Sequence, residues 1–124
     1  MFDILLKSLS TGVVTTAYPN TPAAVSGNAR GRPAIDFARW KDARPAAAAC
    51  PTGAIAVQDK DWHRSATLDL GLCVFCGLCA EVDPAIRMTP ECELAARHRD
   101  GLKTAVRYRL KVDGTQEKLV AGPN

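Results

Sequence analysis

Three cysteines follow one another at intervals of three residues in the segment Cys73–Cys79, which reads CVFCGLC. A C-x2-C-x2-C run wraps three thiolates around one tight loop, which is the pattern that holds a cubane iron–sulfur cluster. Gly77 allows the backbone to turn closely around an inorganic core, and the amides of the loop can point at its sulfides. Since a cubane takes four protein ligands, the run predicts a fourth cysteine from a distant part of the chain.

Cys50 is the candidate for the fourth ligand, because Pro51 follows it. In the bacterial ferredoxin motif C-x2-C-x2-C-x3-C-P, the cysteine before the proline ligates the cluster of the other motif. The predicted ligands of one 4Fe-4S cluster are therefore Cys50, Cys73, Cys76 and Cys79. Zinc is the competing metal, since four thiolates also form a closed zinc site, but structural zinc sites usually draw their ligands in C-x2-C pairs.

The other potential metal ligands among the cysteines and histidines of the chain lie outside this pattern. Cys92 is predicted to be a small buried hydrophobic residue, with a ligand role as the alternative. His63 and His98 lack ligand-like spacing and are expected on the surface. Five cysteines in 124 residues, an odd number, favour metal or redox chemistry in a reducing compartment over a disulfide framework.

With these motifs the chain resembles the two-cluster bacterial-type ferredoxins, which implies an α+β, ferredoxin-like fold. A shift of 33 residues pairs Trp40 with Cys73, Ala43 with Cys76, Ala46 with Cys79, and Cys50 with Asp83. The positions of a second cluster, Trp40, Ala43, Ala46 and Asp83, have all lost cysteine, whereas every ligand of the first is retained. This all-or-none division predicts that one cluster site has been lost as a unit and that one cluster remains.

The replaced positions are consistent with repair of an empty site. Trp40 is expected to fill the vacated volume, with a surface aromatic as the alternative, and Ala46–Ala49 favour a helix without metal. Asp83 is predicted to be a capping or solvent-facing carboxylate. The turn after Pro84 is two residues shorter than the turn after Pro51, as a loop that no longer holds iron allows.

The pattern of the chain predicts three parts: residues 1–33, 34–90 and 91–124. The first part contains a short amphipathic helix within residues 2–14 that ends near Gly12. An extended arm rich in Pro, Gly and Asn follows from Tyr18 to Pro33. The apolar stripe of the helix is expected to contact protein, with a membrane surface as the alternative.

The second part is the compact iron–sulfur domain, in which Pro45 begins a short helix that runs to Cys50. In the third part, the sequence predicts a helix from Glu91 to His98 with Gly101 as its stop. Residues 104–112 alternate apolar and basic side chains, which predicts an exposed strand followed by a turn at Asp113-Gly114. Residues 115–124 carry no pattern that indicates structure.

Charge and hydropathy exclude several classes of function. The net charge is only +3 and the basic residues form no block, so no nucleic-acid footprint is expected. No apolar run approaches the roughly 18 to 20 residues that cross a bilayer, so no membrane span is expected. Because Asp3 precedes only a very short apolar stretch, the N-terminus does not resemble a secretory signal, and a cytoplasmic location is expected.

The regions flanking the cysteines carry a second, more specific resemblance, which covers about residues 1–100. Its elements are the N-terminal helix, Tyr18-Pro19, Arg30-Gly31-Arg32-Pro33, the Cys73–Cys79 loop and the segment Thr89–Ala95. Together they resemble the ferredoxin subunit of respiratory complex I and, more closely, its homologue in formate hydrogenlyase and other membrane-bound group 4 nickel–iron hydrogenases.

This second resemblance implies an electron-transfer subunit of a complex-I-like, hydrogenase-related oxidoreductase, with no catalytic residue of its own. The subunit would sit peripherally on the cytoplasmic side of the membrane and pass electrons to an iron–sulfur small subunit. Two other classes stay open: a free soluble ferredoxin, and a structural subunit whose cluster does not change oxidation state during turnover.

Overall fold

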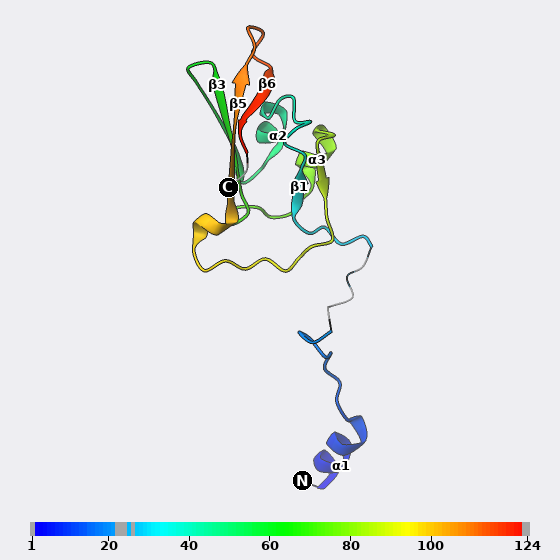
Figure 1. The fold of residues 1–124 in the computed structure, drawn as a ribbon. Helices are drawn as coiled ribbons and strands as arrows, with labels where there is room; N and C mark the ends of the chain where they lie inside the picture. Colours follow the sequence, from blue (N-terminus) through cyan, green and yellow to red (C-terminus); the bar gives the residue numbers. More distant parts are fainter. Residues whose placement is uncertain (1, 22–24, 26, 123–124) are drawn as a thin grey trace.

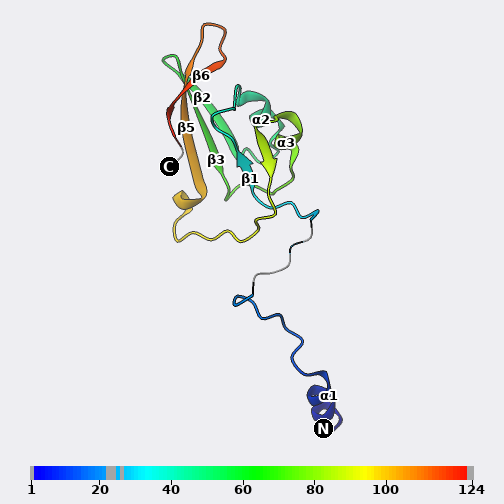
Figure 2. The same cartoon turned by 45° about the vertical axis from the view of Figure 1, so that its right-hand side comes forward.

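The computed structural model describes residues 2–21, 25 and 27–122. Residues 22–24 and 26 of the predicted arm, and the two terminal segments 1 and 123–124, lie outside the described residues. The fold is α+β, with short helices and two antiparallel sheets. The larger sheet lies on one side of the body and the two helices that follow β1 and β3 lie on the other (Figure 1 and Figure 2).

The centre of the chain repeats one strand–helix–strand unit. The first unit is β1 (Pro33–Ile35), α2 (Arg44–Ala49) and β2 (Ile55–Lys60), and the second is β3 (His63–Asp69), α3 (Leu78–Val82) and β4 (Ile86–Met88). β1 pairs antiparallel with β4, and β2 pairs antiparallel with β3, so each strand of one unit pairs with a strand of the other. The helices α2 and α3 also contact each other. The helices end 33 residues apart, at Ala49 and Val82, which is the shift found in the sequence.

Two further strands widen the β2–β3 hairpin into a four-stranded sheet of order β2-β3-β5-β6. β5 (Lys103–Leu110) confirms the predicted strand and the turn at Asp113-Gly114, but its prediction as exposed is wrong. It lies between β3 and β6, and Val106 and Tyr108 are buried because their face covers the core. β6 (Gln116–Ala121) was not foreseen.

The predicted helix from Glu91 to His98 is wrong, because this segment has no helical structure. Its beginning bridges to the arm: the carbonyl of Glu91 accepts the N–H of Arg32 at 2.8 Å, and a 3-10 helix, η1 (Arg99–Leu102), forms only later. The carbonyl oxygen that would start an α-helix is therefore already engaged with another segment. Gly101 lies inside η1 instead of ending a helix.

The N-terminal helix α1 (Phe2–Thr11) confirms the predicted amphipathic helix and its end. Gly12 has a φ of 64° and donates its N–H to the carbonyl of Ser8 at 3.2 Å, which closes the last turn. Figure 1 shows α1 standing clear of the sheets, and its apolar side chains Phe2, Ile4, Leu5, Leu6 and Leu9 are exposed. Among the described residues, no helix is both long and apolar enough to cross a membrane.

The core lies between the larger sheet and the two helices of the repeated unit. Its buried members are Trp40, Ala43, Ala46, Ile55, Ala66, Leu68, Cys79, Ala85, Ile86, Val106 and Tyr108. Small residues on α2 allow the helix to lie close to the sheet, and Trp40 supplies most of the volume at that end. Cys79 belongs to this core, so the candidate site is anchored directly in it.

Candidate iron–sulfur site

The four predicted ligands line one pocket of the body. Cys50 comes from the end of α2, Cys73 and Cys76 from the loop before α3, and Cys79 from the first turn of α3. The rest of the wall is mostly apolar and consists of Pro33, Thr52, Ala54, Ile55, Leu68, Val74, Phe75, Gly77 and Met88. The structure therefore brings Cys50 together with the three cysteines of the loop, the first of which lies 23 residues later in the sequence.

The loop that carries three of the cysteines turns through two left-handed residues. Phe75 has a φ of 54° and Gly77 a φ of 85°, and Gly77 is the residue before the first turn of α3. The N–H of Phe75 donates to the Sγ of Cys73 at 3.4 Å, so one loop amide points at a thiol of the same loop. A glycine suits position 77 because a left-handed backbone strains any residue with a Cβ.

The surroundings of the thiols act in opposite directions on their pKa values. Burial alone would raise the pKa of Cys50, but the backbone N–H groups of Ile55 and Ala54 and the Thr52 hydroxyl bring it below its ordinary value. Burial raises the pKa of Cys73 and Cys79, and neighbouring cysteines add to the effect. Coordination by a metal deprotonates thiols outright, which would remove this penalty.

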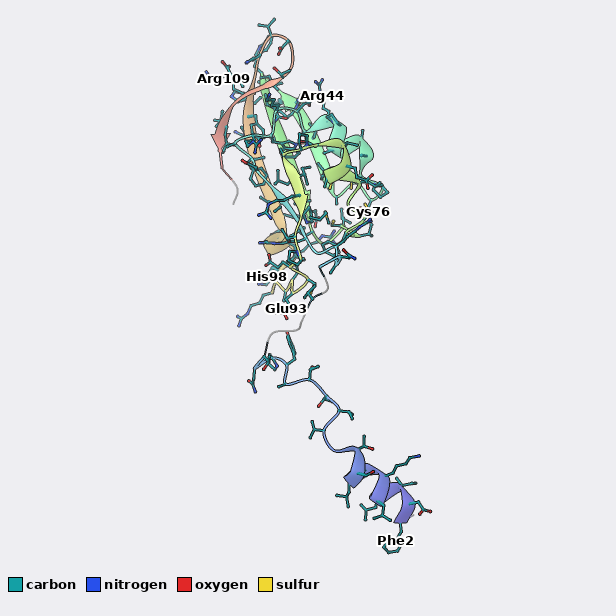
Figure 3. The ribbon with its side chains drawn as sticks, turned by 90° about the vertical axis from the view of Figure 1, so that its right-hand side faces the viewer. Phe2, Arg44, Cys76, Glu93, His98 and Arg109 are labelled. Carbon is teal, nitrogen blue, oxygen red and sulfur yellow. The ribbon has the colours of Figure 1, made fainter. Side chains whose placement is uncertain are left out.

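The donor chemistry of the pocket fits an iron–sulfur cluster. Four thiols surround an apolar space, and soft thiolate ligands select iron–sulfur clusters, zinc and copper(I). Within the described part of the chain, no three His, Cys, Asp or Glu side chains form a group that could hold a single metal ion. The pocket is close to the surface near the cysteine loop, where Figure 3 shows Cys76 at the edge of the body.

The other candidate ligands lie elsewhere. Cys92 is exposed and does not line the pocket, so its prediction as a buried hydrophobic residue is wrong. It lies in the extended segment that replaced the expected helix, so no helical face turns it inward. His98 is exposed before η1, and the partly exposed His63 has its Nδ1 2.8 Å from the Asp61 carbonyl.

The four positions predicted to belong to a lost second site, Trp40, Ala43, Ala46 and Asp83, are all buried and lie in one packed region. Trp40 is 3% exposed, and its indole N–H donates to Asp83 Oδ2 at 2.7 Å. The other oxygen of Asp83 accepts the N–H of Ala85 at 2.9 Å, which confirms its capping role and shows that a solvent-facing carboxylate was wrong. Ala43 and Ala46 are completely buried beside Trp40, so the surface alternative for Trp40 is wrong, and its filling of a vacated cluster site stays a prediction.

Gln116 of β6 completes this end of the body and was missed by the sequence analysis. Its amide donates to the Trp40 carbonyl at 2.8 Å and accepts the N–H of Ala43 at 2.7 Å. A glutamine in a segment without pattern gives no signal of burial, because its partners lie 76 and 73 residues away. An open groove of about 890 Å³ runs along this end, with Trp40, Asp83 and Tyr108 among its lining residues.

The last residues of the predicted arm are part of the site. Pro33 lines the pocket, and Arg30 donates from Nη1 to the Cys76 carbonyl at 2.8 Å. The run from Arg30 to Pro33 is part of the family resemblance in the sequence, but nothing in the sequence connects it to the cysteine loop. The contact joins residues 46 positions apart, which no local pattern reveals.

One comparison with known proteins identifies the family, although no protein-family model matches the chain. NADH-quinone oxidoreductase subunit I 2 of Geobacter metallireducens is 32% identical over 109 residues, which cover 78% of this chain and 83% of that protein. This similarity extends well beyond the cysteine loop and confirms the resemblance to complex I. The chain therefore belongs to the NADH-quinone oxidoreductase subunit I family.

Proposed function

We propose that this protein is an electron-transfer subunit that carries a single 4Fe-4S cluster in a complex-I-like, hydrogenase-related oxidoreductase. The observation that carries the proposal is that Cys50 and the three cysteines of the Cys73–Cys79 loop line the same pocket. Three ligands on one loop and a remote Cys-Pro form the ligand pattern of a cubane, and the family membership supports the same chemistry.

The chain's own residues prepare this pocket for a cluster. Cys50, Cys73, Cys76 and Cys79 are the proposed ligands, and the apolar side chains of Ile55, Leu68 and Phe75 limit access of water. Backbone N–H groups near Cys50 and Cys73 favour charged sulfur, which also influences reduction potential. When bound, a 4Fe-4S cluster supplies one-electron transfer.

Several features support a bacterial-type ferredoxin domain that has kept one of two cluster sites. The order β-α-β-β-α-β and the pairs β1·β4 and β2·β3 form two equivalent units, as the 33-residue shift implies. Cys50 and Asp83 each follow the end of a helix with extended backbone, so they occupy equivalent places in the two units. At the place equivalent to the cysteine pocket, Trp40 and Asp83 stand instead of cysteines and are joined by a hydrogen bond.

The proposed complex supplies the catalytic chemistry and the partners. The Geobacter relative is a subunit of an NADH-quinone oxidoreductase, and we place this chain in a related complex, peripheral on the cytoplasmic side of the membrane. Its acceptor or donor would include an iron–sulfur small subunit. The exposed apolar side chains of α1 support assembly into a larger complex, because a free carrier has little use for such a surface.

Iron analysis of anaerobically purified protein tests the cluster. We expect about four iron and four sulfide per chain, the content of one cubane. Cys50→Ala should lower the iron content as strongly as Cys76→Ala, whereas Cys92→Ala is the matched control and should leave it unchanged. Eight iron per chain, or an intact four-cysteine cluster in the Cys50 variant, would contradict the proposal.

Reduction of the intact complex tests the electron-transfer role and the hydrogenase relationship separately. A cluster signal in electron paramagnetic resonance that appears under turnover supports electron transfer, whereas an unchanging signal would indicate a structural subunit. Reduction by hydrogen gas supports the hydrogenase relationship, and reduction by NADH alone would refute it. Recovery of the chain only as an isolated monomer would favour a free soluble ferredoxin.

A further inference from the structure

The cysteine loop is held from outside by a residue of the N-terminal arm. Arg30 Nη1 donates to the Cys76 carbonyl at 2.8 Å. The same side chain crosses Gly77, where an added Cβ would lie 3.8 Å from Arg30 Cδ and 4.0 Å from its Nε. The arginine therefore lies along the backbone of two successive loop residues, one of which is a proposed ligand.

Arg30 is kept in this place by a backbone strap over the segment that follows β4, formed by residues 30–32. Gly31 donates to the Thr89 carbonyl at 2.8 Å and Arg32 to the Glu91 carbonyl at 2.8 Å, while Thr89 returns its N–H to the Arg32 carbonyl at 3.0 Å. An added Cβ at Gly31 would overlap the carbonyl groups of Thr89 and Glu91, so the strap requires a glycine there. The backbone that follows Arg30 is thus fixed by three hydrogen bonds, and the exposed Arg30 side chain reaches the cysteine loop from this fixed position.

We propose that Arg30 is a positioning residue for the Cys73–Cys79 loop and that its charge raises the reduction potential of the cluster held there. This inference rests on the proposed function. One-electron reduction adds negative charge to the pocket, and a fixed cation next to Cys76 stabilises the reduced form more than the oxidised form. The hydrogen bond also restrains the backbone on which the Cys76 thiolate depends.

Three variants of the full chain separate the charge of Arg30 from its hydrogen bond. Arg30→Met removes both, whereas Arg30→Lys keeps a charge at the end of a flexible stem but lacks the guanidinium fork. Arg87→Met is the matched control, because it removes the same charge from an exposed position on β4. Arg87 precedes the pocket residue Met88 in the strand, so its side chain points to the opposite face.

The readouts are a redox titration followed by electron paramagnetic resonance and the rate at which an iron chelator removes the cluster. Arg30→Met should lower the reduction potential and speed cluster loss roughly two- to tenfold, since an exposed hydrogen bond contributes modestly. Arg30→Lys should restore most of the potential, and Arg87→Met should match the wild type in both measurements. Amide hydrogen exchange of the loop should also rise in Arg30→Met.

The outcomes distinguish this inference from the function on which it rests. A wild-type chain that binds no cubane would overturn both. A loaded wild type with an unchanged potential in Arg30→Met, an equal shift in Arg87→Met, or no recovery in Arg30→Lys would overturn the role of Arg30 alone. The proposed function would stand in each of those three cases.

Discussion

The indole N–H of Trp40 donates to the carboxylate of Asp83 across 2.7 Å, and both side chains are buried. Trp40 precedes α2 and Asp83 follows the end of α3, so the two residues belong to different copies of the repeated unit. Trp40 also packs edge-to-face against Phe37 and Tyr108, with ring centroids 6.1 and 6.3 Å away. This hydrogen bond therefore ties both helical segments to the aromatic part of the core.

Replacement of Trp40 tests how much this end of the body depends on the ring and on its N–H. Trp40→Ala should lower the free energy of unfolding by about 3 to 5 kcal/mol, because it opens a large cavity. Trp40→Phe keeps much of the volume but leaves Asp83 with one fewer partner, and should cost about 1 to 3 kcal/mol. Urea unfolding followed by circular dichroism measures both values. Iron content that falls with either variant would show that this end is not independent of the cysteine pocket.

Gly31 allows the strap of residues 30–32 to lie directly on the segment after β4. Gly31→Ala should destabilise the chain by about 1 to 3 kcal/mol, because its Cβ would overlap the carbonyl groups of Thr89 and Glu91. Gly27→Ala is the matched control, since nothing lies within 4 Å of a Cβ there. Thermal unfolding of the two variants compares them directly, and equal melting temperatures would argue against a tight contact at Gly31.

Arg64 joins three elements through a buried guanidinium. Its Nε and Nη2 each lie 2.7 Å from an oxygen of Asp59, and its Nη1 lies 2.9 Å from Asp42. The hydrogen bonds from Arg64 hold the pKa of Asp59 below its usual range. The pKa of Asp42 is also lowered, mainly by its hydrogen bonds with Arg44 and in addition by the charge of Arg64. A carboxylate with a lowered pKa contributes stability above its unfolded pKa near 4, and that stability is lost as the pH falls through the folded pKa.

Arg64→Met should therefore weaken the dependence of stability on pH below about pH 5. The variant removes the cause of the low pKa of Asp59 while its apolar stem keeps most of the packing. Denaturant unfolding between about pH 6 and pH 3 gives the slope for the variant and the wild type. Identical slopes would mean that Arg64 does not control the titration of Asp59.

Truncation tests whether α1 and the strap of residues 30–32 have separate roles in the N-terminal arm. Deletion of residues 1–27 removes α1 but keeps the strap, so the cluster should load normally while the chain no longer co-purifies with its partners. Deletion of residues 1–33 also removes Arg30, Gly31 and the pocket residue Pro33, and should reduce the iron content. Iron analysis and pull-down from cells measure both effects. Full co-purification of the shorter deletion would exclude α1 as an assembly element.

Local chemistry made part of the fold predictable. Gly12 follows the end of α1, Pro45 lies in the first turn of α2, and the Asp113-Gly114 turn follows β5, because each of these residues favours one backbone geometry over others. The turn between β2 and β3 escaped notice, since Asp61 and Trp62 both adopt positive φ without the glycine that usually marks such a turn. The helix propensity of residues 91–98 was overridden, because the backbone at Glu91 bonds to the arm and the segment forms no helix.

The residues of the candidate site were likewise predictable only where a local sequence pattern indicates them. The C-x2-C-x2-C spacing selected three of the cysteines that the structure brings to one pocket, and the proline after Cys50 selected the fourth. Arg30, Gln116 and Arg64 were not identified, since each acts through partners that are distant or isolated in the sequence. Cys92 was misplaced because its burial depended on a helix that does not form.

The hydrogen bonds of Gln116 to Trp40 and Ala43 give the two ends of the body different vulnerabilities. One end is held by contacts between amino-acid residues, so under the proposed function it does not depend on oxygen, chelators or the supply of iron. At the other end, loss of the proposed cluster would act first on the cysteine pocket, which adjoins the core through Cys79. A chain without the proposed cluster is therefore expected to stay folded at the end formed by Trp40, Asp83 and Gln116.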